Sequence, residues 1–230
     1  MLSAIAIVPS APVVVPELAG AAAADLVDLV AAASAAVADL PEHWVIVGTG
    51  SAEQQMGPDT VGTFAGFGVD LPVRLAPDVA NPAEPEDLPL SVLIGAWLRG
   101  RNRPQASAEA LVWPVDGECA DAVAAGRRLR ADLDARPAPV GVLVVADGIN
   151  SLNPSAPGGY QPELIEVQQS LDDALARGDV GALAELPTPV RGRIAFAVLA
   201  GLAGAGPRTA RELYRGAPLG VGYFVGVWQP

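Results

Sequence analysis

Asp147 and Asn150 are the polar residues of this sequence best placed to carry chemistry. They follow the apolar run Val140–Ala146, which is typical of a strand buried on both faces. In an α/β sheet, ligands bind in the loops that follow the carboxyl ends of strands. Asp147 could act there as a general base, and the nearby Ser151 and Asn153 could hydrogen-bond a ligand. An ordinary strand-to-helix turn is the alternative interpretation, because Asn, Pro and Gly are common turn residues.

Small hydroxyl residues follow two further predicted strands and are candidate nucleophiles. Ser10 comes after the run Ala4–Val8, and Thr49 and Ser51 come after Trp44–Val47. A nucleophilic hydroxyl normally needs an activating His or Lys beside it. The sequence has no Lys, and its single histidine precedes the second of these strands. The nucleophile hypothesis therefore lacks an activating partner.

The loop after residue 146 is similar to a motif of the LigB-like class III extradiol dioxygenases and their MEMO-like relatives. That family carries Gly-Asp-x-Ser-His-x-Leu-Thr-x-x-x-Pro-x-Gly-Tyr, and residues 146–160 read ADGINSLNPSAPGGY. The family's histidine is replaced by Asn150. The residues that match the motif are Asp147, Leu152, Pro157, Gly159 and Tyr160.

The C-terminal segment resembles a second motif of this family, Tyr-Glu-Ala-Pro-Phe-Gly-Val-Gly-Tyr. Ala217-Pro218 and Gly220-Val221-Gly222-Tyr223 match, and Gly216 stands at the acidic metal ligand. Ser10 and Thr49 stand where the family carries His after its first two strands. The resemblance thus implies one pocket at the positions of the lost metal ligands. Its members are Ser10, Thr49, Asn150 and Gly216, with Ser51, Asn153 and Tyr160 as further pocket candidates.

The family's ring-cleavage chemistry uses Fe(II) held by two histidines and one carboxylate. This sequence has one histidine, His43, and it lies outside every motif. One chain therefore cannot supply the usual iron ligands. We predict that the protein has no metal and no cofactor of its own.

Two classes of function remain. The first is a noncatalytic member of the superfamily that binds a small organic molecule or a protein partner. The second is an enzyme of this fold. It would be either a ring-cleavage dioxygenase with an unrecognised or shared metal site, or a metal-independent enzyme that uses Asp147. We favour the first class.

The composition limits the partners. The formal net charge is −12, which argues against nucleic acid and anionic membranes. The sequence has no apolar run of spanning length, and its start lacks the basic region of a signal peptide. Cys119 is the single cysteine, which excludes an internal disulfide. We therefore expect a cytoplasmic protein, and the oligomeric state stays open.

The elements that position these residues alternate between strands and helices, which predicts a single three-layer α/β/α domain over residues 1–230 with a mainly parallel or mixed sheet. Strands are expected over residues 4–8, 44–47, 110–115, 140–146 and 220–227. Helices are expected over residues 21–40, 90–98, 120–135, 163–177, 180–186 and 190–203. Residues 57–75 suggest a hairpin or edge strands, and residues 76–89 suggest an exposed loop. The strands at 4–8, 44–47, 140–146 and 220–227 should be neighbours in one sheet.

Overall fold

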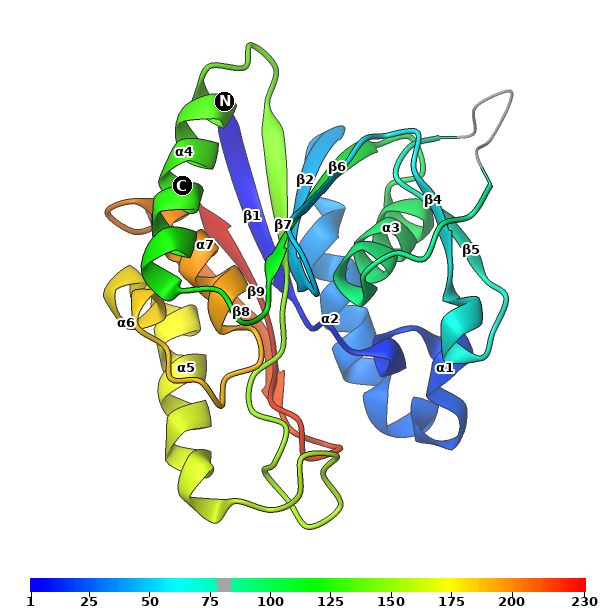
Figure 1. The fold of residues 1–230 in the computed structure, drawn as a ribbon, viewed down its shortest axis with the longest axis vertical. Helices are drawn as coiled ribbons and strands as arrows, with labels where there is room; N and C mark the ends of the chain where they lie inside the picture. The colour runs from blue at the N-terminus through cyan, green and yellow to red at the C-terminus, as the bar shows by residue number, and fades with distance from the viewer. Residues whose placement is uncertain (78–83) are drawn as a thin grey trace.

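The protein is built on a mixed sheet of seven strands in the order β3-β6-β2-β7-β1-β9-β8 (Figure 1). A computed structural model describes residues 1–77 and 84–230. The strands are β1 (Leu2–Val8), β2 (His43–Gly50), β3 (Gln54–Met56), β6 (Ser107–Pro114), β7 (Val140–Val145), β8 (Thr209–Gly216) and β9 (Tyr223–Gln229). The four strands expected to be neighbours are confirmed as the consecutive set β2-β7-β1-β9.

The centre of the sheet is parallel, and its edges are antiparallel. β6, β2, β7 and β1 run in one direction, whereas β3, β9 and β8 pair in the antiparallel sense. Val145 of β7 is opposite Val8 of β1, so these two strands end side by side. All six residues of β7 are buried, as its continuous apolar sequence predicted. The loops after β1 and β7 therefore start from the same sheet edge.

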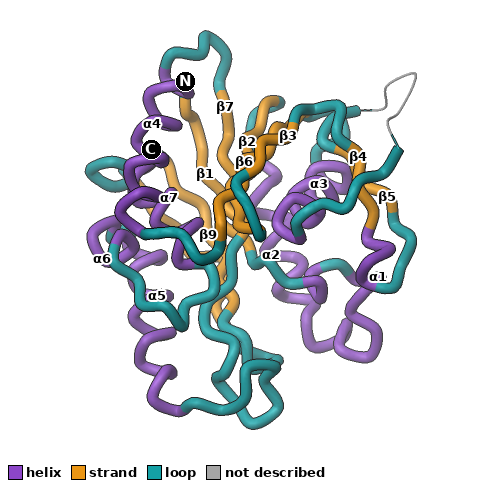
Figure 2. Tube along the Cα trace, viewed as in Figure 1, coloured by secondary structure: helices purple, strands orange, loops and turns teal. Residues whose placement is uncertain are grey.

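Helices cover both faces of the sheet (Figures 1 and 2). Two separate apolar cores result, one for each face. The first face carries α1 (Pro16–Ala19), α2 (Val27–Ala38) and α3 (Leu90–Asn102). The second face carries α4 (Cys119–Asp134), α5 (Ile165–Arg177), α6 (Val180–Ala184) and α7 (Arg193–Ala203). The 3-10 helices are η1 (Pro12–Val14), η2 (Gly20–Leu26), η3 (Phe64–Phe67) and η4 (Pro162–Leu164).

Several predicted boundaries differ from the structure. The helix expected over residues 21–40 is a 3-10 turn followed by α2, and the one expected from Val190 starts at Arg193. Strand β9 begins three residues later than predicted, because Gly220 and Gly222 form backbone hydrogen bonds with the loop after β7. Strand β8 was missed altogether, because its sequence TARELYRG is charged and forms an edge of the sheet.

The region between β2 and α3 forms a small separate sheet. β4 (Val61–Thr63) pairs with β5 (Pro72–Arg74), which confirms the hairpin predicted in residues 57–75. Part of the exposed loop predicted over residues 76–89, namely residues 78–83, lies outside the described residues.

One helical run, Pro16–Ala38, is long and apolar enough by length and composition to cross a membrane. Core helices of soluble proteins meet the same criterion. In this fold, α2 packs against β1 and β9, and its residues Leu29, Ala33 and Val37 are buried there. The expected absence of a membrane partner stays a prediction.

Candidate functional site

The ends of β1 and β7 are joined by a side chain. Asp147 lies two residues beyond the last residue of β7, and Ser10 lies two residues beyond the last residue of β1. An Oδ1 atom of Asp147 accepts a hydrogen bond of 2.8 Å from the backbone N–H of Ser10. The donor therefore does not belong to the turn that follows Asp147. The parallel pairing of β1 and β7 instead brings the neighbouring strand end within reach.

The two segments that resemble family motifs pack against each other. The backbone N–H of Gly148 donates to the carbonyl of Gly222 at 2.9 Å, and the N–H of Gly222 donates to the carbonyl of Ile149 at 2.7 Å. Leu152 N–H donates to the carbonyl of Gly220 at 3.0 Å. The loop after β7 is therefore held by the segment that leads into β9. This pairing explains why β9 begins only at Tyr223.

A cavity of about 430 Å³ opens at this junction, and we call it the Asp147 cavity. Its polar lining comes from Asp147, Asn150, Ser155, Arg191 and Tyr223. Its apolar lining comes from Ala11, Pro12, Val13, Pro157, Leu219 and Val221. The cavity is therefore walled by the loop after β1, the loop after β7, the turn before α7 and the segment that leads into β9. Such a mixture of apolar walls and a few convergent polar groups is typical of a small-molecule site.

Burial raises the pKa of Asp147 to about 7. The hydrogen bond from Ser10 and the positive charge of Arg191 oppose this rise without cancelling it. The carboxyl keeps partial solvent access, because it lines the cavity. Tyr223 is almost fully buried, and burial, followed by the charge of Asp147, raises the pKa of its phenol. Near neutral pH, the phenol of Tyr223 is therefore neutral, and the carboxyl of Asp147 is present in both its protonated and its ionised form.

Arg191 brings a positive charge to the cavity from the other helical layer. Its side chain is exposed, and its backbone N–H donates to the carbonyl of Gly148 at 3.1 Å. The adjacent N–H of Gly192 donates to the carbonyl of Asp147 at 2.8 Å. The turn before α7 is therefore fixed to the turn after β7. This link places Arg191 near enough for its charge to act on the pKa of Asp147.

The residues of this cavity do not fit the iron site that the family resemblance implies. Asp147 is its one carboxylate, and that group already accepts a bond from Ser10. The other candidate donors are neutral amide, hydroxyl or phenol groups, which are weak ligands for Fe(II). Among the described residues, no cluster of three His, Cys, Asp or Glu side chains could hold a metal ion. No step of a reaction is therefore assigned to iron here.

The structure divides the sequence-predicted site residues between two places. Asp147 and Asn150 line the Asp147 cavity, and Ser10 adjoins it through its bond to Asp147. Thr49 and Ser51 instead line a second cavity of about 230 Å³, beside the start of α3. The reason is that β2 pairs with β7 only as far as Val47 and then continues with β6.

The remaining candidates, Gly216, Asn153 and Tyr160, belong to the two resembling segments but do not line the Asp147 cavity. Gly216 pairs with Tyr223 between β8 and β9, and it lies next to the ring of Tyr214. Asn153 accepts from the N–H of Ser155 at 2.9 Å and so shapes its own loop. Tyr160 is exposed over half of its surface. The single pocket expected from the resemblance is therefore not the arrangement observed.

Sequence reasoning missed three polar lining residues, Ser155, Arg191 and Tyr223. Tyr223 belongs to the matched C-terminal motif, so its position in that motif was the available signal. Arg191 lies inside the helix expected over residues 190–203. Its role depends on the contact between the α7 turn and the β7 turn, which leaves no trace in local sequence.

Comparisons with known proteins bear on the fold alone. No protein-family model and no curated protein matches this sequence. The structure is similar to that of an uncharacterized protein from Escherichia coli K12, with a TM-score of 0.55 and 12% sequence identity. The similarity covers 99% of this chain and 100% of that chain. At such low identity the shared feature is the α/β architecture.

Proposed function

We propose that this chain is a LigB-like superfamily member without the iron site, and that it binds a small organic molecule in the Asp147 cavity without cleaving it. The contact between the two resembling segments carries the proposal. These segments, residues 146–160 and 216–223, are far apart in the sequence and yet hydrogen-bond to each other, and both line the cavity. A cavity at the carboxyl ends of parallel strands is the usual ligand position in open α/β sheets.

The lining indicates a small organic acid as the ligand. The guanidinium of Arg191 is a suitable partner for a carboxylate, since the two groups form charge-assisted hydrogen bonds. The apolar side chains of Pro12, Val13 and Leu219 would contact the body of the ligand. The carboxyl of Asp147 can donate or accept a hydrogen bond, because its pKa of about 7 leaves both forms populated at neutral pH.

An enzymatic function is the second candidate, and the pKa of Asp147 favours its metal-independent form. A general base works best when its pKa lies near the operating pH. Asp147 could then remove a proton from a bound acid in the cavity. A dioxygenase that uses an unrecognised or shared metal site is the other form of this candidate. We place it last, because the cavity's donors do not fit iron.

The net charge of −12 supports a partner other than nucleic acid or an anionic membrane surface. A protein partner remains an alternative occupant of the site. A cytoplasmic location is likewise part of this proposal.

Ligand-detected NMR with a panel of small aliphatic and aromatic acids, phenols and amines tests the proposal. We expect acids to bind and amines not to bind. Arg191→Ala should weaken acid binding about tenfold or more, the usual effect of losing a charge-assisted hydrogen bond. The variant keeps the backbone N–H that bonds Gly148, so the turn should stay in place.

Arg128→Ala is the matched control, because Arg128 is exposed on α4 and does not line the Asp147 cavity. Its acid affinity should equal that of the wild-type protein. The proposal fails if no acid binds, or if acids bind Arg191→Ala as tightly as they bind the wild-type protein.

A further inference from the structure

Gln168 lies behind the Asp147 cavity, on α5, and is buried although its side chain is polar. It lies on the buried face of α5 together with Leu171 and Leu175. A buried amide needs hydrogen-bond partners for its oxygen and its nitrogen. Both partners are present, and they belong to different parts of the fold.

We propose that Gln168 is a positioning residue for the Asp147 cavity, and that Asp172 orients its amide. The Oε1 atom of Gln168 accepts a hydrogen bond of 2.8 Å from the backbone N–H of Ile149. Ile149 lies between the two lining residues Asp147 and Asn150 on the turn after β7. The amide oxygen thus fixes one wall of the cavity from behind.

The same side chain also sets the second wall. A Cβ atom added at Gly222 would lie 2.2 Å from the amide of Gln168, and one added at Gly148 would also lie 2.2 Å from it. Only glycine permits this approach without displacing the amide. Gly222 separates Val221 from Tyr223, and both of these line the cavity. The amide of Gln168 therefore contacts both the turn after β7 and the segment that leads into β9.

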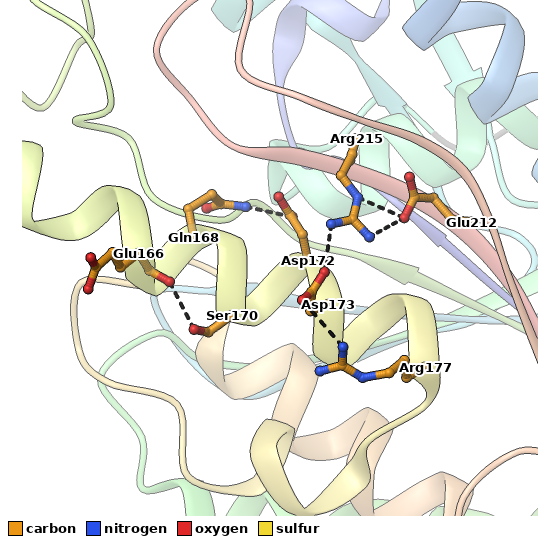
Figure 3. Close-up of polar contacts among 8 residues, drawn as sticks. All are labelled: Glu166, Gln168, Ser170, Asp172, Asp173, Arg177, Glu212 and Arg215. Carbon is orange, nitrogen blue, oxygen red and sulfur yellow. Dashed lines mark hydrogen bonds and ion pairs between the residues drawn. The ribbon is translucent and has the colours of Figure 1, made fainter.

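Asp172 determines which way the amide faces. The Nε2 atom of Gln168 donates to Oδ1 of Asp172 at 2.8 Å (Figure 3). An ionised carboxylate only accepts hydrogen bonds, so it holds the NH₂ group toward itself. The oxygen of the same amide then faces Ile149. A rotated amide would place its NH₂ group against the N–H of Ile149, where two donors meet.

The charges around Asp172 come from two elements. Strand β8 contributes Arg215 and Glu212, and α5 itself contributes Asp173. Arg215 donates to Asp173 at 2.9 Å and to Glu212 (Figure 3). The two other elements packed on this part of α5, namely α6 and β9, have no charged residue in their sequences. Burial, the largest influence, raises the pKa of Asp172 to about 6.

The inference rests on the proposed function only in treating the Asp147 cavity as the ligand site. The positions of the walls can be measured on the free protein. Amide hydrogen exchange and backbone chemical shifts by NMR provide that measurement. In Gln168→Ala, the N–H of Ile149 should exchange about tenfold faster, because it loses its acceptor. The signals of Asn150 and Tyr223 should shift as well.

Gln169→Ala is the matched control, since Gln169 is the exposed neighbour on the same helix. Its exchange rate at Ile149 should equal that of the wild-type protein. An unchanged rate at Ile149 in Gln168→Ala would overturn the inference.

Gln168→Glu separates positioning from a general loss of stability, and it also serves if Gln168→Ala does not fold. The new carboxyl is isosteric and can still accept from Ile149. At pH 8 it would face the carboxylate of Asp172, whereas at pH 5 the two groups can share a proton. We expect the exchange rate at Ile149 and the wall signals to match those of the wild-type protein at pH 5, and to differ from those of the wild-type protein at pH 8. A match to the wild-type protein at both pH values would overturn the role of Asp172.

Asp172→Asn added to Gln168→Glu should remove the difference from the wild-type protein at pH 8, because the amide of Asn at position 172 can donate to the carboxylate at position 168. A difference at pH 8 that persists in the double variant would contradict the inference. Acid binding, followed with benzoate, is a separate result. If benzoate and the other acids fail to bind the wild-type protein while Gln168→Ala still displaces the walls, the proposed ligand site is rejected and the positioning role stands.

Discussion

Asp147 accepts a hydrogen bond of 2.8 Å from the backbone N–H of Ser10, across the ends of two adjacent parallel strands. The bond joins the loop after β1 to the loop after β7, and both loops line the same cavity. A buried carboxyl is costly unless its oxygens have partners. Asp147, which matches the LigB-like motif in the sequence, thus also links the two loops at the carboxyl ends of these strands.

Asp147→Ala should therefore lower the melting temperature. The change leaves the N–H of Ser10 without its acceptor and removes side-chain atoms from the wall. A loss of about 1–3 kcal/mol in the free energy of unfolding is expected at pH 5, where the wild-type carboxyl carries its proton. Thermal unfolding followed by circular dichroism measures it. An unchanged melting temperature would mean that Asp147 has no structural role.

Asp147→Asn should make the protein more stable at high pH. The folded protein keeps a proton on Asp147 up to about pH 7, whereas the ordinary pKa of an Asp side chain, which applies in the unfolded chain, is 3.8. The stability that this proton provides is complete below pH 3.8 and is lost as the pH rises through about 7. Asn keeps an acceptor oxygen without a charge. It should gain on the order of 1 kcal/mol or more over wild type at pH 8, and less at pH 5.

Chemical denaturation of both proteins at pH 5 and pH 8 tests this expectation. Asp173→Asn is the control, because the Asp173 side chain is only half-buried and the arginines Arg215 and Arg177 lower its pKa. That variant should show no gain at pH 8. Equal pH profiles for the wild-type protein and Asp147→Asn would contradict the raised pKa of Asp147.

Gly222→Ala should destabilise the protein by about 1–3 kcal/mol. The added Cβ would lie 2.2 Å from the amide of Gln168, so the amide must move and lose its bonds to Ile149 and Asp172. Gly100→Ala is the matched control, because a Cβ there meets no atom within 4 Å and the residue lies in α3. That change should stabilise the helix by about 0.5–1 kcal/mol. Equal effects of the two substitutions on the denaturation midpoint would contradict the close packing at Gly222.

The purified protein should neither retain iron nor cleave catechols. Asn150 and Gly216 lie where the resembling LigB-like motifs carry metal ligands, and neutral oxygen donors compete poorly with water for Fe(II). Anaerobic loading with Fe(II), desalting and metal analysis measure retention, and oxygen uptake with a catechol panel measures activity. Stoichiometric iron together with catechol-dependent oxygen uptake would restore the dioxygenase hypothesis.

The sequence alone was enough to predict the α/β class and the central strands. Parallel strands that are buried on both faces have continuous apolar sequences, and Val140–Ala146 is such a run. The loop after it was also predictable, because Asn, Pro and Gly interrupt both helix and strand. Edge strand β8 was not, since a strand with one open edge tolerates the charged residues that local rules assign to loops.

The composition of the site was decided by tertiary structure. Asp147 and Asn150 could be found because they follow a recognisable strand. Arg191 reaches the cavity only because the turn before α7 bonds to the carbonyls of Asp147 and Gly148. Thr49 lies outside the expected site because β2 extends beyond Val47, the last residue that pairs with β7. Strand order, strand length and loop contacts join residues far apart in the chain, and such pairings carry no local periodicity that a sequence could display.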